Sequence, residues 1–309
     1  AESETLPPDY GLGVAAGTTG EFAGADVGVR GSLNWSQEWR QQDRVDRLLT
    51  ASQGELVLRD DLLRQQTDRN VDVGAFATAS LDWGKHQLTS NSFLLRSSRQ
   101  RTQLTEGTTV ISDELEVRNT LLDWNERESA GQQFVGEHDF PALEVTWRAM
   151  LAEAERDNPD RRRSSRVRGV GSSNPFSLSD QASSSRRWLD TVDEVGSFSI
   201  DLKRTVLDSK RWGLDVKGGV STYSQLRSTN IRTLGLDVDN ASGLDRTKPT
   251  EELLRPENLG NGISVSDDTD EIDLFAGQAL VDAAYLKADA KWRDTLRVVA
   301  GLRRGEADF

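Results

Sequence analysis

The chain has 309 residues, of which 35% are hydrophobic, with no cysteine and a formal net charge of -13. The absence of cysteine excludes a disulfide framework and any thiolate metal site or nucleophile, and the acidic balance argues against a nucleic-acid partner. No apolar run approaches the roughly 18 residues of a transmembrane helix, which excludes a helical membrane protein. Residues 1–4 are acidic and lack a signal-peptide pattern, so we expect a removed signal or an internal piece.

Apolar and polar residues alternate in stretches along the chain, which is the pattern of strands with one apolar and one wet face. Residues 25–35 show it most cleanly, because every odd position is apolar or small and every even one is polar or glycine. The pattern predicts ten strands, over residues 11–17, 25–35, 71–83, 88–96, 115–138, 143–151, 192–202, 212–220, 275–288 and 296–302.

The connections between these strands alternate in length. Short turns are expected near residues 18–21, 84–86, 139–142, 207–210 and 289–292, and long polar loops over 41–70, 97–113, 157–190 and 227–273. Outer-membrane barrels have short periplasmic turns and long extracellular loops. Strands of about nine to eleven residues also suit a tilted bilayer crossing. We therefore expect an all-β fold, an antiparallel transmembrane β-barrel of about ten meander strands.

Aromatic residues gather at the expected strand ends. Five fall at or beside short turns and are predicted to form one aromatic girdle: Phe22, Trp83, Phe140, Trp212 and Trp292. Trp35, Trp39 and Trp188 fall near the expected long loops. Barrels carry such girdles because an amphipathic ring prefers the headgroup zone. The alternative for any one of these residues is ordinary packing at a strand end.

The polar strand faces would line a lumen. The candidate lumen-facing residues are Asp26, Arg30, Asn34, Asp72, Asp82, Glu144, Arg148, Asp201, Lys203, Asp215 and Lys217.

Several segments resemble the barrel of a TonB-dependent outer-membrane receptor. They are LPPDYGL at 6–12, SNSFLLRSS at 90–98, ERE at 126–128, GEH at 136–138, WRA at 147–149, AERDNPD at 154–160, EELL at 251–254, PEN at 256–258, AAY at 283–285 and LRVVAGLR at 296–303.

This resemblance implies a function in ligand import. Members of that family have a TonB box and a plug domain before a barrel of about 22 strands. Residues 1–309 are thus expected to form one partial barrel domain, with no plug and no TonB box and with the later strands missing. The implied role is binding and TonB-coupled import of a scarce ligand, of siderophore, vitamin, glycan or peptide class, across the outer membrane of a Gram-negative bacterium. Expected partners are outer-membrane lipid, lipopolysaccharide and, through the absent plug region, the TonB complex.

Two other functions stay open. A passive porin or structural outer-membrane barrel would share the strand pattern without a plug. A soluble β-rich binding module would share the strands but not the need for lipid.

Catalytic chemistry has little support in the sequence, and no enzyme activity or cofactor is expected. His86 and His138 belong to no recognisable triad and are expected to be solvated, and Ser183, Ser184 and Ser185 are expected to be loop residues. The acidic run offers weak candidates for a cation site, Asp267, Asp268, Asp270 and Glu271, against the simpler reading of a solvated loop. Lipopolysaccharide phosphates or an anionic ligand could be contacted by the loop candidates Arg161, Arg162, Arg163, Arg166 and Arg168.

Overall fold

The computed structural model describes residues 5–52, 54–110, 114–179, 184–239, 243–293 and 295–309, so the expectation for residues 1–4 lies outside the described part. Within that part, the fold is a single antiparallel sheet of 12 strands with very little helix, which confirms the predicted all-β class. The strands are β1 (Tyr10–Phe22), β2 (Ala25–Ser52), β3 (Glu55–Trp83), β4 (His86–Val110), β5 (Glu114–Phe140), β6 (Leu143–Gly169), β7 (Ser177–Leu178), β8 (Ser184–Asp208), β9 (Trp212–Val238), β10 (Ile263–Asp267), β11 (Leu274–Trp292) and β12 (Leu296–Asp308).

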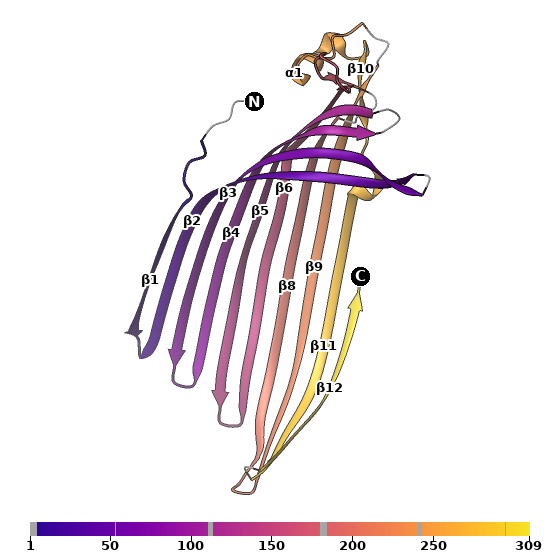
Figure 1. Ribbon diagram of the computed structural model, residues 1–309. Helices are drawn as coiled ribbons and strands as arrows, with labels where there is room; N and C mark the ends of the chain where they lie inside the picture. The colour runs from indigo at the N-terminus through magenta and orange to yellow at the C-terminus, as the bar shows by residue number, and fades with distance from the viewer. Residues whose placement is uncertain (1–4, 53, 111–113, 180–183, 240–242, 294) are drawn as a thin grey trace.

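Ten of these strands form the predicted meander. Their order across the sheet, β1-β2-β3-β4-β5-β6-β8-β9-β11-β12, follows the chain, so each strand pairs with its neighbours in sequence (Figure 1). The two short strands lie off this path, with β7 paired to β6 and β10 to β9. Local hairpin connections are the simplest way to build an antiparallel sheet.

The strands are much longer than the sequence pattern predicts. The central ones, from β2 to β9 on the main path, have between 25 and 29 residues. The predicted loops over 41–70, 97–113 and 157–190, and the first part of 227–273, are therefore wrong over most of their described length, because the strands continue through them. The turns expected at 18–21 and 289–292 are also wrong, since β1 continues to Phe22 and β11 to Trp292.

The extended ends are strands with polar residues on both faces. Backbone hydrogen bonding continues there, but neither face is apolar, so hydropathy shows no period of two. Opposite charges also face one another across the strands, as in Arg64–Asp46 at 2.6 Å and Arg101–Asp68 at 2.7 Å. More exposed pairs, such as Arg47–Asp61 at 3.1 Å, contribute little stability each, so the extension of the strands rests on the backbone hydrogen bonds.

The register separates two faces of the sheet. Residues directly opposite one another in antiparallel strands share a face. One row contains Val27, Leu81, Leu88, Gly136, Trp147, Ile200, Val220 and Ala284, and the face it lies on is called the apolar face below. The adjacent row contains Asp26, Asp82, Gln87, Glu137, Thr146, Asp201, Gly219 and Tyr285, and defines the polar face.

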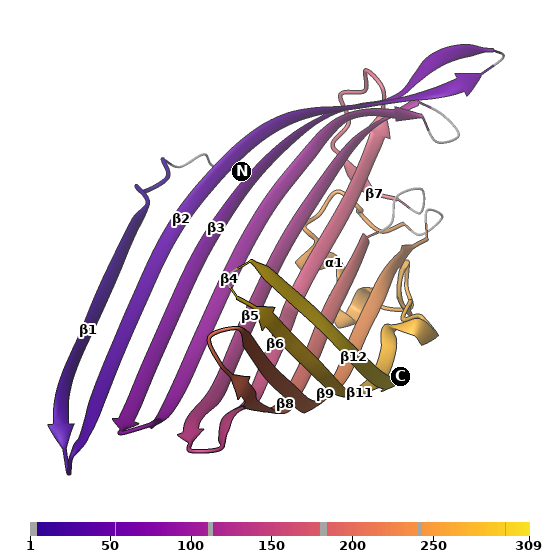
Figure 2. The same ribbon diagram turned by 90° about the horizontal axis from the view of Figure 1, so that it is seen from below.

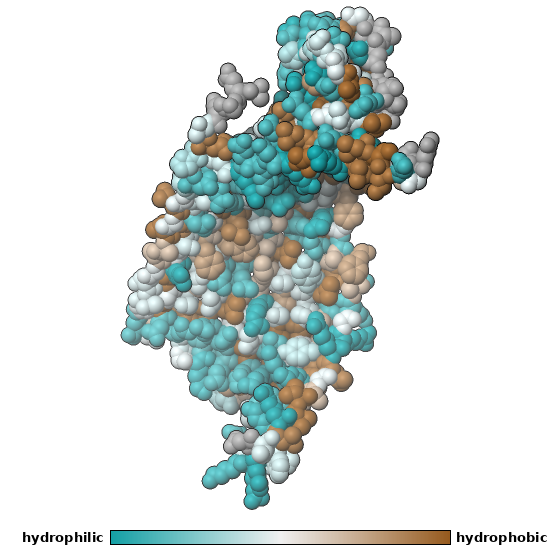
Figure 3. Space-filling view, in the orientation of Figure 1, coloured by the Kyte–Doolittle hydropathy of each residue, from teal (hydrophilic) through white to brown (hydrophobic). Residues whose placement is uncertain are grey.

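The sheet is strongly curved, and the upper ends of β2 and β3 arch over it (Figures 1 and 2). The polar face is the more enclosed one, because the carboxylates of Asp68 and Asp201 are only 9% and 15% exposed. On the apolar face Leu151 is 72% exposed. Figure 3 shows one side of the molecule, on which hydrophilic residues spread over much of the strand region.

The sheet is open in the described residues. β1 and β12 lie at its two edges and each pairs with one neighbour only, β2 and β11 respectively. The predicted β-barrel is therefore observed only as an antiparallel sheet, and closure into a barrel is not seen in these residues.

The connection after β9 folds into a small cap at the upper end. It holds α1 (Thr250–Leu253), the 3-10 turns η1 (Pro256–Asn258) and η2 (Glu271–Asp273), and β10. Its apolar core is small, formed by Leu178, Val238, Leu253 and Ile263. No helix among the described residues is long and apolar enough to cross a membrane.

Candidate functional site

All five predicted girdle residues lie on the apolar face at the short-turn end of the sheet. The register brings Trp212 opposite Trp292, with their ring centroids 6.3 Å apart. Trp83 lies next to His86 at 5.6 Å, and Phe140 lies 5.1 Å from the same imidazole. Phe22 ends β1 at the same end of the sheet and is 75% exposed. These residues form the turn-end aromatic row.

A second aromatic row crosses the same face farther along the strands. Its members, placed on this face by the register, are Tyr10, Trp35, Trp39, Trp124 and Trp188. The rings of Tyr10 and Trp35 lie 5.2 Å apart. The expectation that Trp35, Trp39 and Trp188 lie near long loops is wrong, because their strands continue well past them. The sequence pattern missed Tyr10 and Trp124, which only the register assigns to this row.

The part of this face next to the turn-end aromatic row forms an apolar band. Charged residues, Glu126 and Glu128 on β5 and Asp190 and Glu194 on β8, lie between this band and the tryptophans of the second row. Residues 25–35 of β2 rise about 33 Å along the strand, which is about 25 Å for a strand tilted by about 40°. Exposed apolar side chains fill this band, among them Val14, Val29, Leu33, Leu94, Phe134, Leu151, Phe198, Leu286 and Val298. Charged residues appear on the same face just beyond it, as in the Arg96–Glu126 pair at 2.7 Å.

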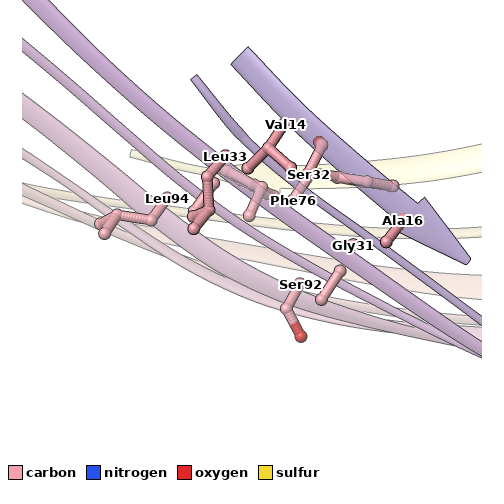
Figure 4. A pocket seen from close by; sticks show the side chains of 11 residues that line it. Val14, Ala16, Gly31, Ser32, Leu33, Phe76, Ser92 and Leu94 are labelled. Carbon is pink, nitrogen blue, oxygen red and sulfur yellow. The ribbon is translucent and has the colours of Figure 1, made fainter. Parts of the chain in front are cut away.

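A shallow depression of about 570 Å³ lies within this band (Figure 4). It is lined by small residues such as Ala16, Gly31 and Ala77 and by the larger apolar side chains of Val14, Leu33 and Leu94. Almost no polar groups line the depression, so it could accommodate an apolar chain but offers no groups for hydrogen bonding or catalysis.

The ten charged lumen candidates, and Asn34, share the polar face by register. Asp201 is the centre of one network there. Its carboxylate lies 3.5 Å from Arg148 Nη1 and 3.3 Å from Lys217 Nζ, and it accepts a hydrogen bond from the Tyr285 hydroxyl at 2.5 Å. Gly219 leaves room for this network, since a Cβ there would lie 2.4 Å from Asp201 Oδ1 and 2.7 Å from the Tyr285 ring.

Other candidates on the polar face form smaller pairs. Lys203 Nζ donates to both carboxylate oxygens of Glu144, at 3.0 and 3.1 Å. Asp215 accepts from the Thr205 hydroxyl at 2.7 Å. Asp26 faces Asp82 directly across the β2–β3 pair. The face thus combines fixed charge pairs with solvated carboxylates.

The five arginines predicted to lie in a loop lie on β6 instead, because that strand continues to Gly169. Successive residues of a strand alternate between the faces, and a bulge between Asn158 and Arg161, which shifts the register by one residue, decides which arginines lie on which face. Arg161 and Arg163 lie on the polar face, and Arg162, Arg166 and Arg168 on the other.

Three of these arginines have partners within the fold. Arg162 and Arg186 both bind Asp160, which holds the pKa of that carboxyl below its ordinary value. Arg166 donates to the carbonyl oxygens of Arg246, Thr247 and Lys248, at 3.1, 3.2 and 2.7 Å.

Arg168 also binds within the fold. It pairs with Glu116 at 2.5 Å and lies over the Phe176 ring. The hydrogen bond from Arg168, with one from the Gly171 amide, lowers the pKa of Glu116.

A cavity of about 490 Å³ lies between these strands and α1, and no pattern in the sequence indicates it. Its apolar wall includes Leu122, Trp188 and Leu254, and Arg162 and Arg186 line another side. The guanidinium of Arg186 lies 4.9 Å from the centre of the Trp188 ring.

The acidic run forms its own turn. Asp267 ends β10 and accepts from the amide of Thr269 at 3.2 Å and from its hydroxyl, which lowers the pKa of Asp267. Asp270 caps the turn that begins at Glu271, and Asp268 lies beside Gly235. In the described residues, no group of three or more acidic or histidine side chains is arranged to hold a metal.

The two histidines are half-buried, and the expectation that they are solvated is wrong. The register places His86 opposite His138, with their Nδ1 atoms 3.3 Å apart. Trp147 donates to His138 Nε2 at 3.1 Å, so the pair belongs to the turn-end aromatic cluster.

Of the three serines, Ser183 lies outside the described residues. Ser184 is buried and its hydroxyl accepts from the Ser165 amide at 2.9 Å, while Ser185 lies on β8. Neither Ser184 nor Ser185 lies in a loop as predicted.

Scans against family models and curated proteins found no match to this chain.

Proposed function

We propose that this chain forms part of the wall of an outer-membrane β-barrel that binds a scarce ligand and takes part in its TonB-coupled import in a Gram-negative bacterium. The observation that carries the proposal is the exposed apolar band next to the turn-end aromatic row. At the strand tilt of about 40° usual in outer-membrane barrels it would be about 25 Å high, and the opposite side of the same strands carries the Asp201 network. A sheet with one lipid-like and one water-like face suits the wall of a barrel.

The lengths of the strands support an orientation. The apolar band begins at the short turns, and the strands continue for many residues beyond its other edge. In outer-membrane barrels the turns on the periplasmic side are short, so the extended ends, the α1 cap and its cavity would face the outside. Lipopolysaccharide would then surround the upper part of the wall.

The proposed mechanism is binding and gating without bond-making. Capture would take place at the extended ends and on the polar face, and coupling to the TonB complex would require a plug domain. A soluble binding module is less consistent with the fold, because water would contact the large apolar face.

Tryptophan quenching in vesicles tests the membrane assignment. With the full chain refolded into lipid vesicles, brominated acyl chains should quench tryptophan emission strongly and aqueous iodide weakly. Replacing Trp212 and Trp292 by phenylalanine should remove only part of the lipid quenching, because the other six of the eight tryptophans lie on the same face. Full quenching by iodide, with the chain monodisperse and free of detergent, would support the soluble module instead.

A flux assay separates the receptor from the passive porin. Vesicles containing the protein together with its plug should show saturable ligand binding and no free sugar permeation. Rapid swelling in neutral sugars, without saturable binding, would favour the porin.

A further inference from the structure

The polar face carries a group of arginines above the apolar band. Arg99 on β4, Arg127 on β5, Arg156 and Arg161 on β6 and Arg187 on β8 all fall on this face by register. We call these five residues the arginine patch. They lie on four adjacent strands of the more enclosed face, in a chain whose net charge is -13.

Like charges face each other directly within the patch. Arg127 is the cross-strand partner of Arg156, and Arg161 is the partner of Arg187. Directly opposed like charges destabilise a strand pair. Partial desolvation of the Arg156 guanidinium, which still reaches solvent, and the nearby guanidiniums of Arg127, Arg99 and Arg187 lower the pKa of Arg156, so these side chains are close enough to repel one another.

The patch has little internal compensation. The Asp123 carboxylate counters the positive charge around Arg156, but Asp123 is also the cross-strand partner of Arg101 and acts on that arginine as well. Asp68 nearby is occupied by Arg101, through bonds of 2.7 and 3.1 Å. Among the residues that the structure describes, positive charge therefore exceeds negative charge in this part of the face.

Buried donors in the patch also lack partners. The Nε atoms of Arg99 and Arg187 and the Nδ2 atom of Asn125 are buried and donate no hydrogen bond within the described residues. Asn125 lies directly opposite Arg99 and is only 5% exposed. Buried donors are nearly always satisfied, so each of these needs an explanation. Arg127, Arg156 and Arg161 are exposed and accessible to a ligand.

We propose that the arginine patch binds a small soluble molecule with several carboxylate or phosphate groups. Guanidinium forks match both groups with two hydrogen bonds each, and an anion between opposed arginines removes their repulsion. The two opposed pairs are separated by roughly 15 Å along β6, which suits more than one anionic group. Lipid headgroups would contact the other face, so the ligand is a free anion. The inference rests on the proposed function and names the class of its ligand.

Calorimetric titration of the full chain in phosphatidylcholine vesicles tests the patch, with citrate and pyrophosphate as probes. We expect at least one probe to bind saturably, with an affinity that falls as salt rises. The double variant Arg127→Gln/Arg156→Gln should weaken binding by about tenfold or more. The matched control Arg118→Gln/Arg232→Gln, which removes two charges from the apolar-face side, should bind as the parent chain does.

The charge-conserving variant Arg156→Lys is the control for misfolding, and it should keep most of the affinity. No binding of either probe to the parent chain, or equal binding by the double variant, would overturn the proposal. An acidic peptide that binds where both probes fail would also overturn it. Tryptophan quenching in the same vesicles separates the outcomes, because a chain that inserts without binding anions refutes this inference and leaves the membrane assignment standing.

Discussion

Single glycines decide how closely the strands' side chains can pack on the polar face. Gly219 lies against Asp201 and Tyr285, so the ion-pair network occupies the space that a Cβ would need. Gly136 has a similar role on the apolar face, where the Trp147 ring covers it. Glycine fits at such positions because a large side chain from a neighbouring strand occupies the space that a Cβ would need. The sequence of one strand alone does not show this.

Replacing Gly219 by valine should lower the free energy of unfolding by about 1–3 kcal/mol, because the new methyl groups displace Asp201 and Tyr285. Urea unfolding in vesicles measures the loss. Gly213→Val is the control on the same strand and face, since a Cβ there meets its nearest neighbour only at 3.7 Å. Equal losses in both variants would show that the network does not set the cost.

At the scale of elements, the upper cap depends on one arginine of β6. Arg166 links that strand to three successive carbonyl groups before α1, and charged hydrogen bonds of this kind contribute more than neutral ones. The cap has only a small apolar core of its own, so this link is a large part of what holds it.

Arg166→Met should release the cap while the sheet stays intact. Limited proteolysis should then cleave within residues 243–262 at least several times faster than in the parent chain. Arg163→Met is the control on the same strand. Unchanged cleavage would mean that the apolar core and the β9–β10 pairing hold the cap without this link.

Acid should loosen the extended strand ends. The hydrogen bonds from Arg168 and from Arg162 hold the pKa values of Glu116 and Asp160 below their ordinary values near 4.5 and 3.8. A carboxyl with a lowered folded-state pKa stabilises the fold above its unfolded pKa, and this contribution disappears as the pH falls through the lowered value. Protection factors of the amides in the upper parts of β5 and β6, which correct for the intrinsic exchange rate, should therefore fall below about pH 4.

The double variant Glu116→Gln/Asp160→Asn isolates these groups. Its upper strands should already exchange faster at pH 6 and should change less on acidification. Acid sensitivity equal to that of the parent chain would assign the effect to other carboxyls.

The lower half of each strand could be predicted from the sequence, and the upper half could not. In residues 25–35 one face is apolar, so hydropathy alternates and reveals the strand. In residues 41–52 both faces are polar, and pairing is visible only in contacts between distant residues, such as Arg64 with Asp46. The arginine patch could not be predicted from the sequence for the same reason, because its residues come from four strands. The girdle aromatics were predictable, since they sit beside turns that the sequence marks.

At the scale of the whole molecule, the sheet is an open curved wall with two chemically different sides. Contact of the exposed apolar side with lipid stabilises the fold, whereas contact of the same side with water destabilises it. Both edge strands also expose unpaired backbone groups in the described residues, which favours pairing with further strands.

A lysine on the apolar side tests this asymmetry. Leu33→Lys should destabilise the vesicle-inserted state by about 2–4 kcal/mol, because the charge would face the acyl chains. The adjacent change Asn34→Lys, on the polar face, should have little effect. Urea titration of the inserted chain gives both values. A neutral or favourable effect of Leu33→Lys would indicate a water-exposed surface.

Single-cysteine scanning is the most direct test of the two-sided wall, and the chain suits it because it has no native cysteine. Each position from 26 to 35 would be replaced in turn, and its labelling by a water-soluble maleimide measured in vesicles. If β2 has one lipid-facing and one water-facing side, labelling should show a period of two. Even positions such as Asp26, Arg30 and Asn34 should be labelled, and odd positions such as Val27, Val29 and Leu33 should be protected. Equal labelling of odd and even positions would rule out a wall with two different sides.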